Sequence, residues 1–167
     1  MENLFSSIVA KQAGISSEHP LARVLTGRGN IIELTQRTYD AALRPEPTGG
    51  LTHAERAALA CRIAQLNNDN SLAAHFEDMI QFSENIKLIS DITDTGFKGG
   101  DDPRIRAIIR HTDLVTTLPR AATDADICAL RSVGVADEDI VRLSELIAFV
   151  SYLVRVLAGL RLMAAVA

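Results

Sequence analysis

The sequence predicts a single, all-helical domain. Apolar residues make up 47% of the chain, while aromatic residues make up only 4%, a balance that favours close helix packing over a sheet. These apolar residues recur at helical spacing without strand-like alternation. A length of 167 residues is enough for one core, whereas two cores would each be near the lower practical size. We therefore expect one domain spanning residues 1–167.

Residues 1–50 are expected to be a helical preamble. Two groups of apolar and small residues each fall on one helix face: Leu4, Phe5, Ile8 and Val9, and then Ile31, Leu34, Thr38 and Ala42. The segment 44–50 contains two prolines and two glycines, which cannot continue a helix. A connection is therefore predicted there.

Residues 51–92 are predicted to form a core helical hairpin. Thr52 and Glu55 have the spacing of a capping box, in which each side chain accepts from the other's backbone N–H, so a helix should begin at this point. The polar segment 67–71 should end that helix, and a second helix should run over about 72–89.

Residues 103–167 are predicted to hold the C-terminal helices. After a loop over 90–102, Asp102 and Pro103 provide an N-cap and a first-turn proline. A short helix should start at Thr123 and stop at Gly134, and the acidic segment 137–139 suits the N-terminus of the last helix.

The last helix carries two adjacent apolar stripes. They consist of Ile140, Leu143, Ile147, Val150, Val154 and Leu157, and of Leu146, Phe149, Leu153, Val156 and Leu160. So wide an apolar surface requires two partners. We expect this helix to be central to the bundle or shared with another subunit, and predict a homo-oligomer.

Composition and patterning exclude several classes of function. The formal net charge is -4 and the basic residues are scattered, so nucleic acid is not an expected partner. The apolar stretch 146–154 is interrupted by Arg155, well short of the roughly 20 residues of a membrane helix, and no secretion signal starts the chain. Cys61 and Cys128 match no disulfide or metal-ligand spacing. We expect a cytoplasmic protein without metal or cofactor.

The segment from Leu51 to His75 resembles the core hairpin of the alkylhydroperoxidase D / carboxymuconolactone decarboxylase superfamily: a helix start with Glu, an apolar helix, a polar turn, and a helix with His. In the hydroperoxidase branch the turn carries Cys-x-x-Cys followed by His. That template places Asn68 and Ser71 at the two cysteine positions and His75 at the histidine. The part from Arg104 to Arg155 is similar to peroxidase-related members. The resemblance implies an alkylhydroperoxidase D-like helical bundle.

The same resemblance implies a function that does not use the two-cysteine mechanism. In the family a cysteine thiolate attacks the hydroperoxide and a second cysteine resolves it, with Glu and His relaying protons, but Asn68 and Ser71 provide no thiol. The first hypothesis is proton transfer by His75, oriented by Glu55, on a small carboxylate or lactone, as in the decarboxylase branch without that cysteine pair.

Other interpretations stay open at this point. His75 could be an ordinary helix histidine, and Glu55 could act only in its capping box. The chain could be a non-catalytic oligomeric protein that binds a companion protein or a small-molecule ligand on the same fold. A third hypothesis is residual hydroperoxide reduction through Cys61, although a buried cysteine is usually inert.

Overall fold

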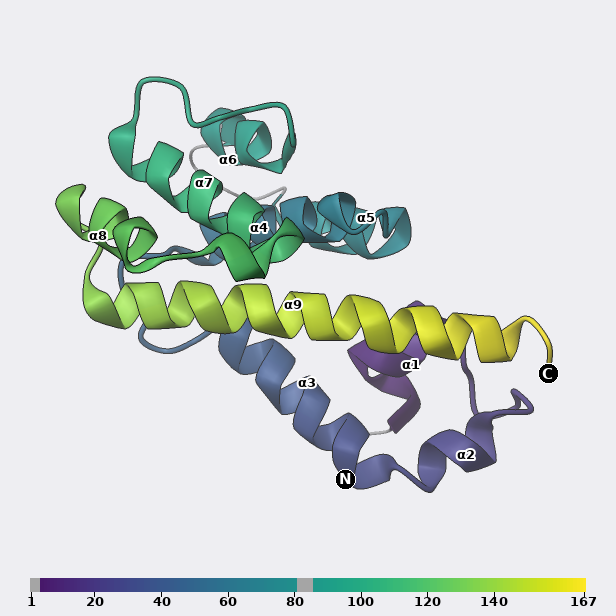
Figure 1. The fold of residues 1–167 in the computed structure, drawn as a ribbon. Coiled ribbons are helices and arrows are strands. Elements are labelled where there is room, and N and C mark those ends of the chain that lie inside the picture. The colour runs from purple at the N-terminus through teal and green to yellow at the C-terminus, as the bar shows by residue number, and fades with distance from the viewer. Residues whose placement is uncertain (1–3, 81–85) are drawn as a thin grey trace.

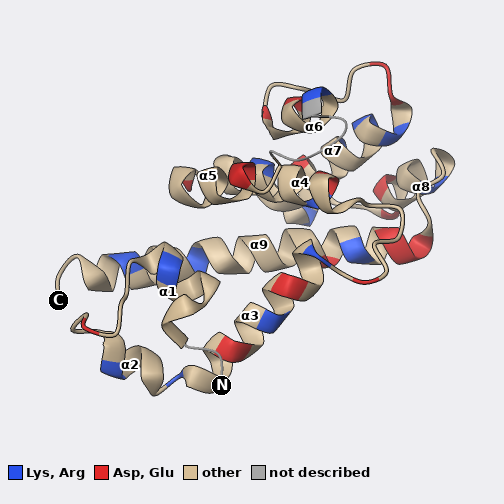
Figure 2. Cartoon of the chain, turned by 180° about the vertical axis from the view of Figure 1, so that it is seen from behind, with Lys and Arg blue, Asp and Glu red and all other residues tan. Residues whose placement is uncertain are grey.

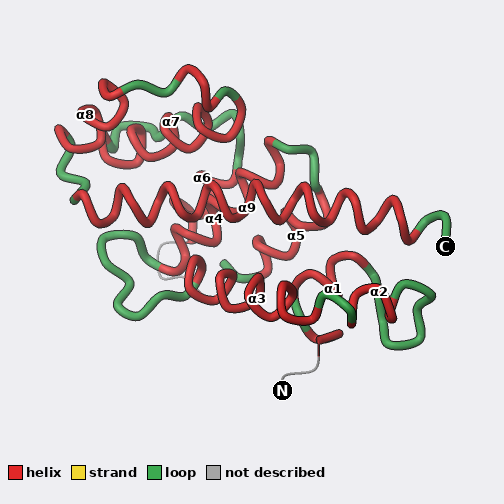
Figure 3. The backbone as a smooth tube through the Cα atoms, turned by 60° about the horizontal axis from the view of Figure 1, so that its bottom comes forward, coloured by secondary structure: helices red, strands yellow, loops and turns green. Residues whose placement is uncertain are grey.

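The computed structural model describes residues 4–80 and 86–167, and each regular element within them is a helix (Figure 1). In chain order the elements are η1 (Leu4–Ser6), α1 (Ile8–Ala13), α2 (Ala22–Thr26), α3 (Gly29–Leu43), α4 (His53–Leu66), α5 (Asn70–Asp78), α6 (Ile86–Thr93), α7 (Pro103–Thr117), η2 (Pro119–Ala121), α8 (Asp124–Ser132) and α9 (Asp137–Ala164). The described part of the chain shows helices and loops and no strand (Figure 3). The predicted all-α class is confirmed.

Helix α9 lies between the two halves of the fold. Helices α1, α2 and α3 lie on one side of it, and α4, α5, α6 and α7 lie on the other (Figure 1). It contacts α1, α3, α4, α7 and α8, and it supplies ten buried residues. The prediction that this helix is central is therefore correct, whereas sharing it with another subunit stays a prediction.

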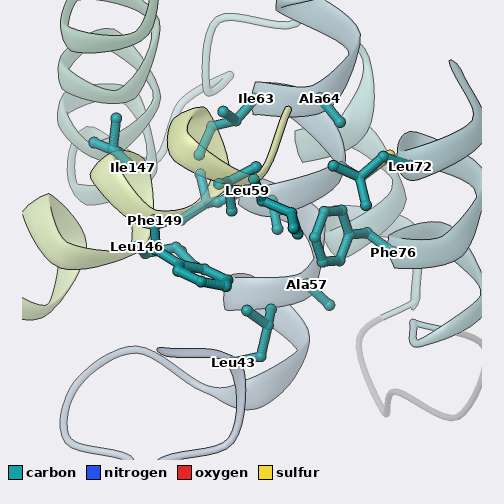
Figure 4. Close-up of a cluster of buried hydrophobic side chains, with 14 of the residues drawn as sticks. Leu43, Ala57, Leu59, Ile63, Ala64, Leu72, Phe76, Leu146, Ile147 and Phe149 are labelled. Carbon is teal, nitrogen blue, oxygen red and sulfur yellow. The ribbon is translucent and has the colours of Figure 1, made fainter. Parts of the chain in front are cut away.

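Helix α4 is the other core element, and nine consecutive residues of it, 56–64, are buried. Together with α5 and α9 it forms a close-packed apolar cluster (Figure 4). Members of this cluster include Leu43, Leu59, Ile63, Leu72, Phe76, Leu146, Ile147 and Phe149. Four alanines of α4 are also buried, and such small side chains allow neighbouring helices to approach closely.

The helix starts follow the predicted caps. Thr52 and Glu55 form the reciprocal capping box, and a second one joins Thr123 to Asp126. Asp102 accepts from the backbone N–H groups of Arg104 and Ile105, immediately before the first turn of α7. Local side-chain chemistry was therefore sufficient to place these three N-termini.

The prediction of one helix over 72–89 was wrong in its extent. Helix α5 ends at Asp78, and residues 79 and 80 continue only as tighter turns, with Met79 N–H donating to Phe76 and Ile80 N–H to Glu77. Residues 81–85 lie outside the described part, and α6 then includes Ser90–Thr93, which the sequence had suggested was loop. The sequence does not mark this break, because residues 78–89 contain neither glycine nor proline, and Ile80 and Ile89 on either side of it are both buried apolar residues.

Helix α9 is apolar over a longer stretch than residues 146–154, the segment that the sequence alone singled out. An 18-residue window of this 28-residue helix has a mean hydropathy of 1.8, so by length and composition alone α9 could cross a membrane. A core helix passes the same test, and α9 packs against helices on both sides. Figure 2 shows acidic and basic residues interspersed over the fold without a basic stripe.

Two arginines of α4 are completely enclosed, and each holds a connection in place. Arg56 is 1% exposed and donates to the carbonyl oxygens of Ala42, Thr48 and Leu51, which flank and form the predicted connection at 44–50. Arg62 is 0% exposed and pairs with Asp113 of α7 through two hydrogen bonds of 2.5 and 2.7 Å.

The Arg62 guanidinium also fixes the loop between α6 and α7. It donates to the carbonyl oxygens of Ile92, Asp94, Thr95 and Phe97. A buried guanidinium is tolerated only when its charge and its N–H groups are satisfied, and this one is. Arg62 thus ties α4 to α7 and to the loop between α6 and α7 at one point.

We expect Arg62→Met to lower the free energy of unfolding by about 3–5 kcal/mol, because it leaves several carbonyl oxygens without their partner and leaves the Asp113 carboxylate with only the exposed Lys98. Urea unfolding followed by circular dichroism measures the change. Arg131→Met is the matched control, since the Arg131–Asp137 pair lies on the surface and should leave the midpoint nearly unchanged. Equal effects of the two substitutions would contradict this role of Arg62.

Candidate functional site

The turn between α4 and α5 positions the candidate site. Asn68 has a φ of 61°, a left-handed conformation that asparagine tolerates better than most residues. Asp69 follows as the N-cap of α5 and accepts from Leu72 N–H at 3.0 Å. Its carboxylate also pairs with Arg161 of α9 at 2.8 Å. The turn is therefore fixed at both ends, and this sets the direction in which α5 leaves it.

His75 lies in the last turn of α5, where its ring contacts Tyr39 of α3, a partner that the sequence did not predict. The Tyr39 hydroxyl of α3 is 2.7 Å from His75 Nε2, and the two form a hydrogen bond. The same hydroxyl is 3.3 Å from the Met79 sulfur. The His75 ring also packs edge-on against Phe76, with ring centroids 5.4 Å apart. His75 is thus held by α3 and by its own helix.

Burial shifts the pKa values of Tyr39 and His75. Desolvation lowers the pKa of His75 from its ordinary value of 6.5, with Lys11 and Arg44 lowering it further and Asp78 opposing them. Desolvation also raises the pKa of Tyr39 to about 12. Both groups are therefore neutral at pH 7, and the imidazole is in the form that can accept a proton.

The second ring nitrogen of His75, Nδ1, has no hydrogen-bond partner among the described residues, and the side chain is half-buried. If the Tyr39 hydroxyl donates to Met79, Nε2–H donates to the tyrosine oxygen and Nδ1 is a free base. If the hydroxyl donates to Nε2 instead, Nδ1 carries the proton and can donate it. The pair can thus support either direction of proton transfer at Nδ1.

Polar groups from α1 and α5 surround the same place. Ser71 lies one turn before His75, so the two side chains are on one face of α5. The exposed Ser71 hydroxyl contacts Gln12 Oε1 of α1 at 3.4 Å. Lys11, the neighbour of Gln12, and Arg44 at the end of α3 are close enough to His75 to lower its pKa. Hydroxyl, amide and cationic groups therefore converge near His75.

Glu55 has other partners than His75. Its carboxylate accepts from Thr52 N–H in the capping box and pairs with Arg104 of α7 at 2.7 Å. The hydrogen bond of the His75 ring goes to Tyr39. The structure therefore assigns Glu55 a role in joining α4 to α7, and it brings Tyr39, which the sequence analysis missed, to His75.

Cys61 lies inside the bundle. Its side chain is 0% exposed, and burial raises the pKa of the thiol to about 11, with Glu77 adding to the effect. Gln65 Nε2 is 3.6 Å from the sulfur. A peroxidatic cysteine requires an accessible thiolate, so this environment argues against peroxide chemistry at Cys61.

A groove of about 810 Å³ opens between α3 and α9 on the other side of Tyr39. Its lining includes Ile31, Leu34, Thr38 and Ala42, the residues that the sequence grouped on one helix face. Phe149 of α9 lies in its wall and packs edge-on against the Tyr39 ring at 6.3 Å. His75 does not line the groove. Within residues 4–80 and 86–167 no three metal-binding side chains come together.

Comparison with known proteins identifies the fold. No family model and no curated protein matches the chain. Among solved structures it is similar to an uncharacterized peroxidase-related protein from Silicibacter sp. TM1040, with a TM-score of 0.69 and 19% sequence identity over 83% of this chain and 73% of that one. At this identity the likeness concerns the fold alone. The chain therefore has the all-helical fold of a peroxidase-related protein, in keeping with the alkylhydroperoxidase D-like bundle expected from the sequence.

The two cysteines should differ sharply in reactivity. Ellman's reagent should modify Cys128, which is exposed, rapidly in the native protein, and Cys61 only after unfolding in urea, because Cys61 is buried and its thiol is largely protonated. Cys128→Ser is the control, and it should show no rapidly reacting thiol. Rapid labelling of native Cys128→Ser would mean that Cys61 is accessible and would revive the thiol hypothesis.

Proposed function

We propose that this protein binds a small carboxylate or lactone at His75 and uses the histidine for proton transfer. The observation that carries the proposal is the 2.7 Å hydrogen bond between Tyr39 and His75 Nε2, which leaves Nδ1 available. A histidine held through one nitrogen presents the other in a fixed direction, as general acid–base catalysis requires. Tyr39, and not Glu55 as the sequence suggested, is the residue whose hydrogen bond orients the His75 ring.

The electrostatic surroundings favour an anionic ligand. Asp78 is the strongest single charge acting on His75, and Lys11 and Arg44 act against it together, so these two cations are the groups that a ligand carboxylate could pair with. Ser71 and Gln12 add a hydroxyl and an amide that can bind ligand oxygen atoms. A carboxylate paired with these cations would place against neutral Nδ1 either an O–H group or a C–H group α to a carbonyl. Nδ1 then takes up the proton, and the electron pair stays on the oxygen as an alkoxide or is delocalised into the carbonyl as an enolate.

The structural neighbour is a peroxidase-related protein, which favours hydroperoxides as a competing substrate class. In this chain Asn68 and Ser71 stand at the positions of the family's two cysteines, and Cys61 is enclosed. Thiol-dependent peroxide reduction through Cys61 therefore has the least support of the three hypotheses.

The alternative is a non-catalytic oligomeric or partner-binding protein. The open groove between α3 and α9 favours it, because Leu34 and Tyr152 in its lining are 53% and 41% exposed. Exposed apolar groups gathered in one groove are typical of a binding surface. Binding at this groove and chemistry at His75 are compatible, since they involve different sides of α3.

A thermal-shift screen against small carboxylates, lactones and hydroperoxides tests the proposal. A ligand at a hundredfold excess over its dissociation constant stabilises the native state by about 2.7 kcal/mol. For a domain of this size that raises the melting temperature by roughly 2–4 °C per kcal/mol. We expect a carboxylate or lactone to produce such a shift in the wild type and in His53→Ala, an exposed-histidine control on α4.

The same ligand should give no shift with His75→Ala and a reduced shift with Tyr39→Phe, which keeps the ring and removes the hydroxyl. A shift that persists in His75→Ala would place the ligand elsewhere. If carboxylates and lactones all fail to shift the wild type, the interaction-protein alternative is favoured.

A further inference from the structure

The solvent-facing side of α9 carries a regular stripe. Its members follow one another at alternating steps of four and three residues: Val141, Glu145, Ala148, Tyr152, Arg155, Gly159 and Leu162, and then Val166 just beyond the helix end. All eight are exposed, and the apolar members Val141, Tyr152 and Leu162 are 57%, 41% and 72% exposed. Alternating four and three is the spacing by which one helix packs along another in a coiled coil. The opposite side of α9 already fills the core.

Helix α3 extends this stripe into a wider surface. The groove of about 810 Å³ joins Glu145, Ala148 and Tyr152 of the stripe to Ile31 and Leu34 of α3. Ile31 and Leu34 are 36% and 53% exposed. Tyr152 is fixed at the groove wall by a 3.2 Å hydrogen bond between its hydroxyl and that of Thr35. The surface thus combines apolar side chains with the charged residues Glu145 and Arg155, and the hydrogen bond of Tyr152 fixes part of it.

We propose that a second copy of this chain occupies this surface, with the α9 helices of the two copies packed antiparallel about a twofold axis near Val150. The part of the stripe from Val141 to Gly159 supplies the argument, because its spacing is the same in both directions about this position. In an isologous interface each residue meets the residue equally far on the other side of the axis. Glu145 of one copy then faces Arg155 of the other.

The remaining pairs also suit this register. Ala148 faces Tyr152 of the second copy, so a small side chain leaves room for a large one, and Val141 faces Gly159 in the same way. A parallel arrangement would instead oppose Glu145 to Glu145 and Tyr152 to Tyr152, which charge repulsion and size disfavour. Among the described residues Glu145 is in no ion pair within 4 Å and acts on buried Arg56 only through its charge, and Arg155 donates to the carbonyl oxygen of Ser151 in its own helix. Arg37 provides another cation in the groove.

The interface would adjoin the His75 site without containing it. Phe149 and Tyr152 pack against each other with ring centroids 6.3 Å apart, and Phe149 contacts Tyr39, the partner of His75. A second copy on the groove would cover this aromatic wall from outside. The dimer proposal stands independently of the chemistry at His75, because no interface residue belongs to the polar group around that histidine.

Charge reversal tests both the partner and the register. Sedimentation velocity over a range of protein concentrations should show a wild-type dimer. Glu145→Arg and Arg155→Glu should each raise the dissociation constant roughly tenfold or more, since each places like charges opposite one another. The double variant Glu145→Arg/Arg155→Glu should regain the dimer, because it restores the pair with its signs exchanged.

Glu33→Arg is the matched control, an exposed acid of α3 that does not line the groove, and it should dimerise as the wild type does. Circular dichroism confirms that the single variants keep their helices, as expected for exposed positions. A monomeric wild type overturns the proposal. A double variant that stays as weak as the single variants overturns the antiparallel register.

Discussion

The fold depends on two buried arginine side chains in one helix. Arg56 and Arg62 are enclosed within α4, and each donates to carbonyl oxygens of a connection that has no regular structure of its own. A buried guanidinium needs acceptors for its N–H groups, and an irregular backbone segment needs donors for its carbonyl oxygens. The hydrogen bonds between them meet both requirements. α4 therefore fixes the course of the chain before it and after it, in addition to packing against α5 and α9.

The candidate site is a consequence of this arrangement. Arg56 binds Ala42 in the last turn of α3, and so fixes where α3 ends against α4. The turn at Asn68 and Asp69 fixes how α5 leaves α4. Tyr39 and His75 are 36 residues apart in the sequence, and they meet because α3 and α5 are both set by α4. This packing desolvates His75, which lowers its pKa, and holds the ring at Nε2 through the Tyr39 hydroxyl.

The sequence was informative where structure is decided locally. The caps at Thr52, Asp102 and Thr123 and the turn at 67–71 all depend on neighbouring residues, and they were predictable. The break after Asp78 was not, because no glycine or proline marks it in the sequence. The partners of His75 and Glu55 were not predictable either. They come from α3 and α7, and a single sequence carries no signal for contacts between distant segments, although Tyr39 is one of only two tyrosines in the chain.

The proposed chemistry depends on a His75 ring that is neutral at pH 7 and held at Nε2 by Tyr39. Long-range proton–nitrogen NMR of the imidazole ring measures this directly, with His75→Ala identifying the resonance among the four histidines. The account predicts that His75 titrates below its ordinary pKa of 6.5, so that at pH 7 the ring is neutral and Nδ1 can exchange a proton with a ligand. A His75 ring that titrates at or above 6.5 would contradict the account, because it would mean that the packing around Tyr39 does not desolvate the histidine.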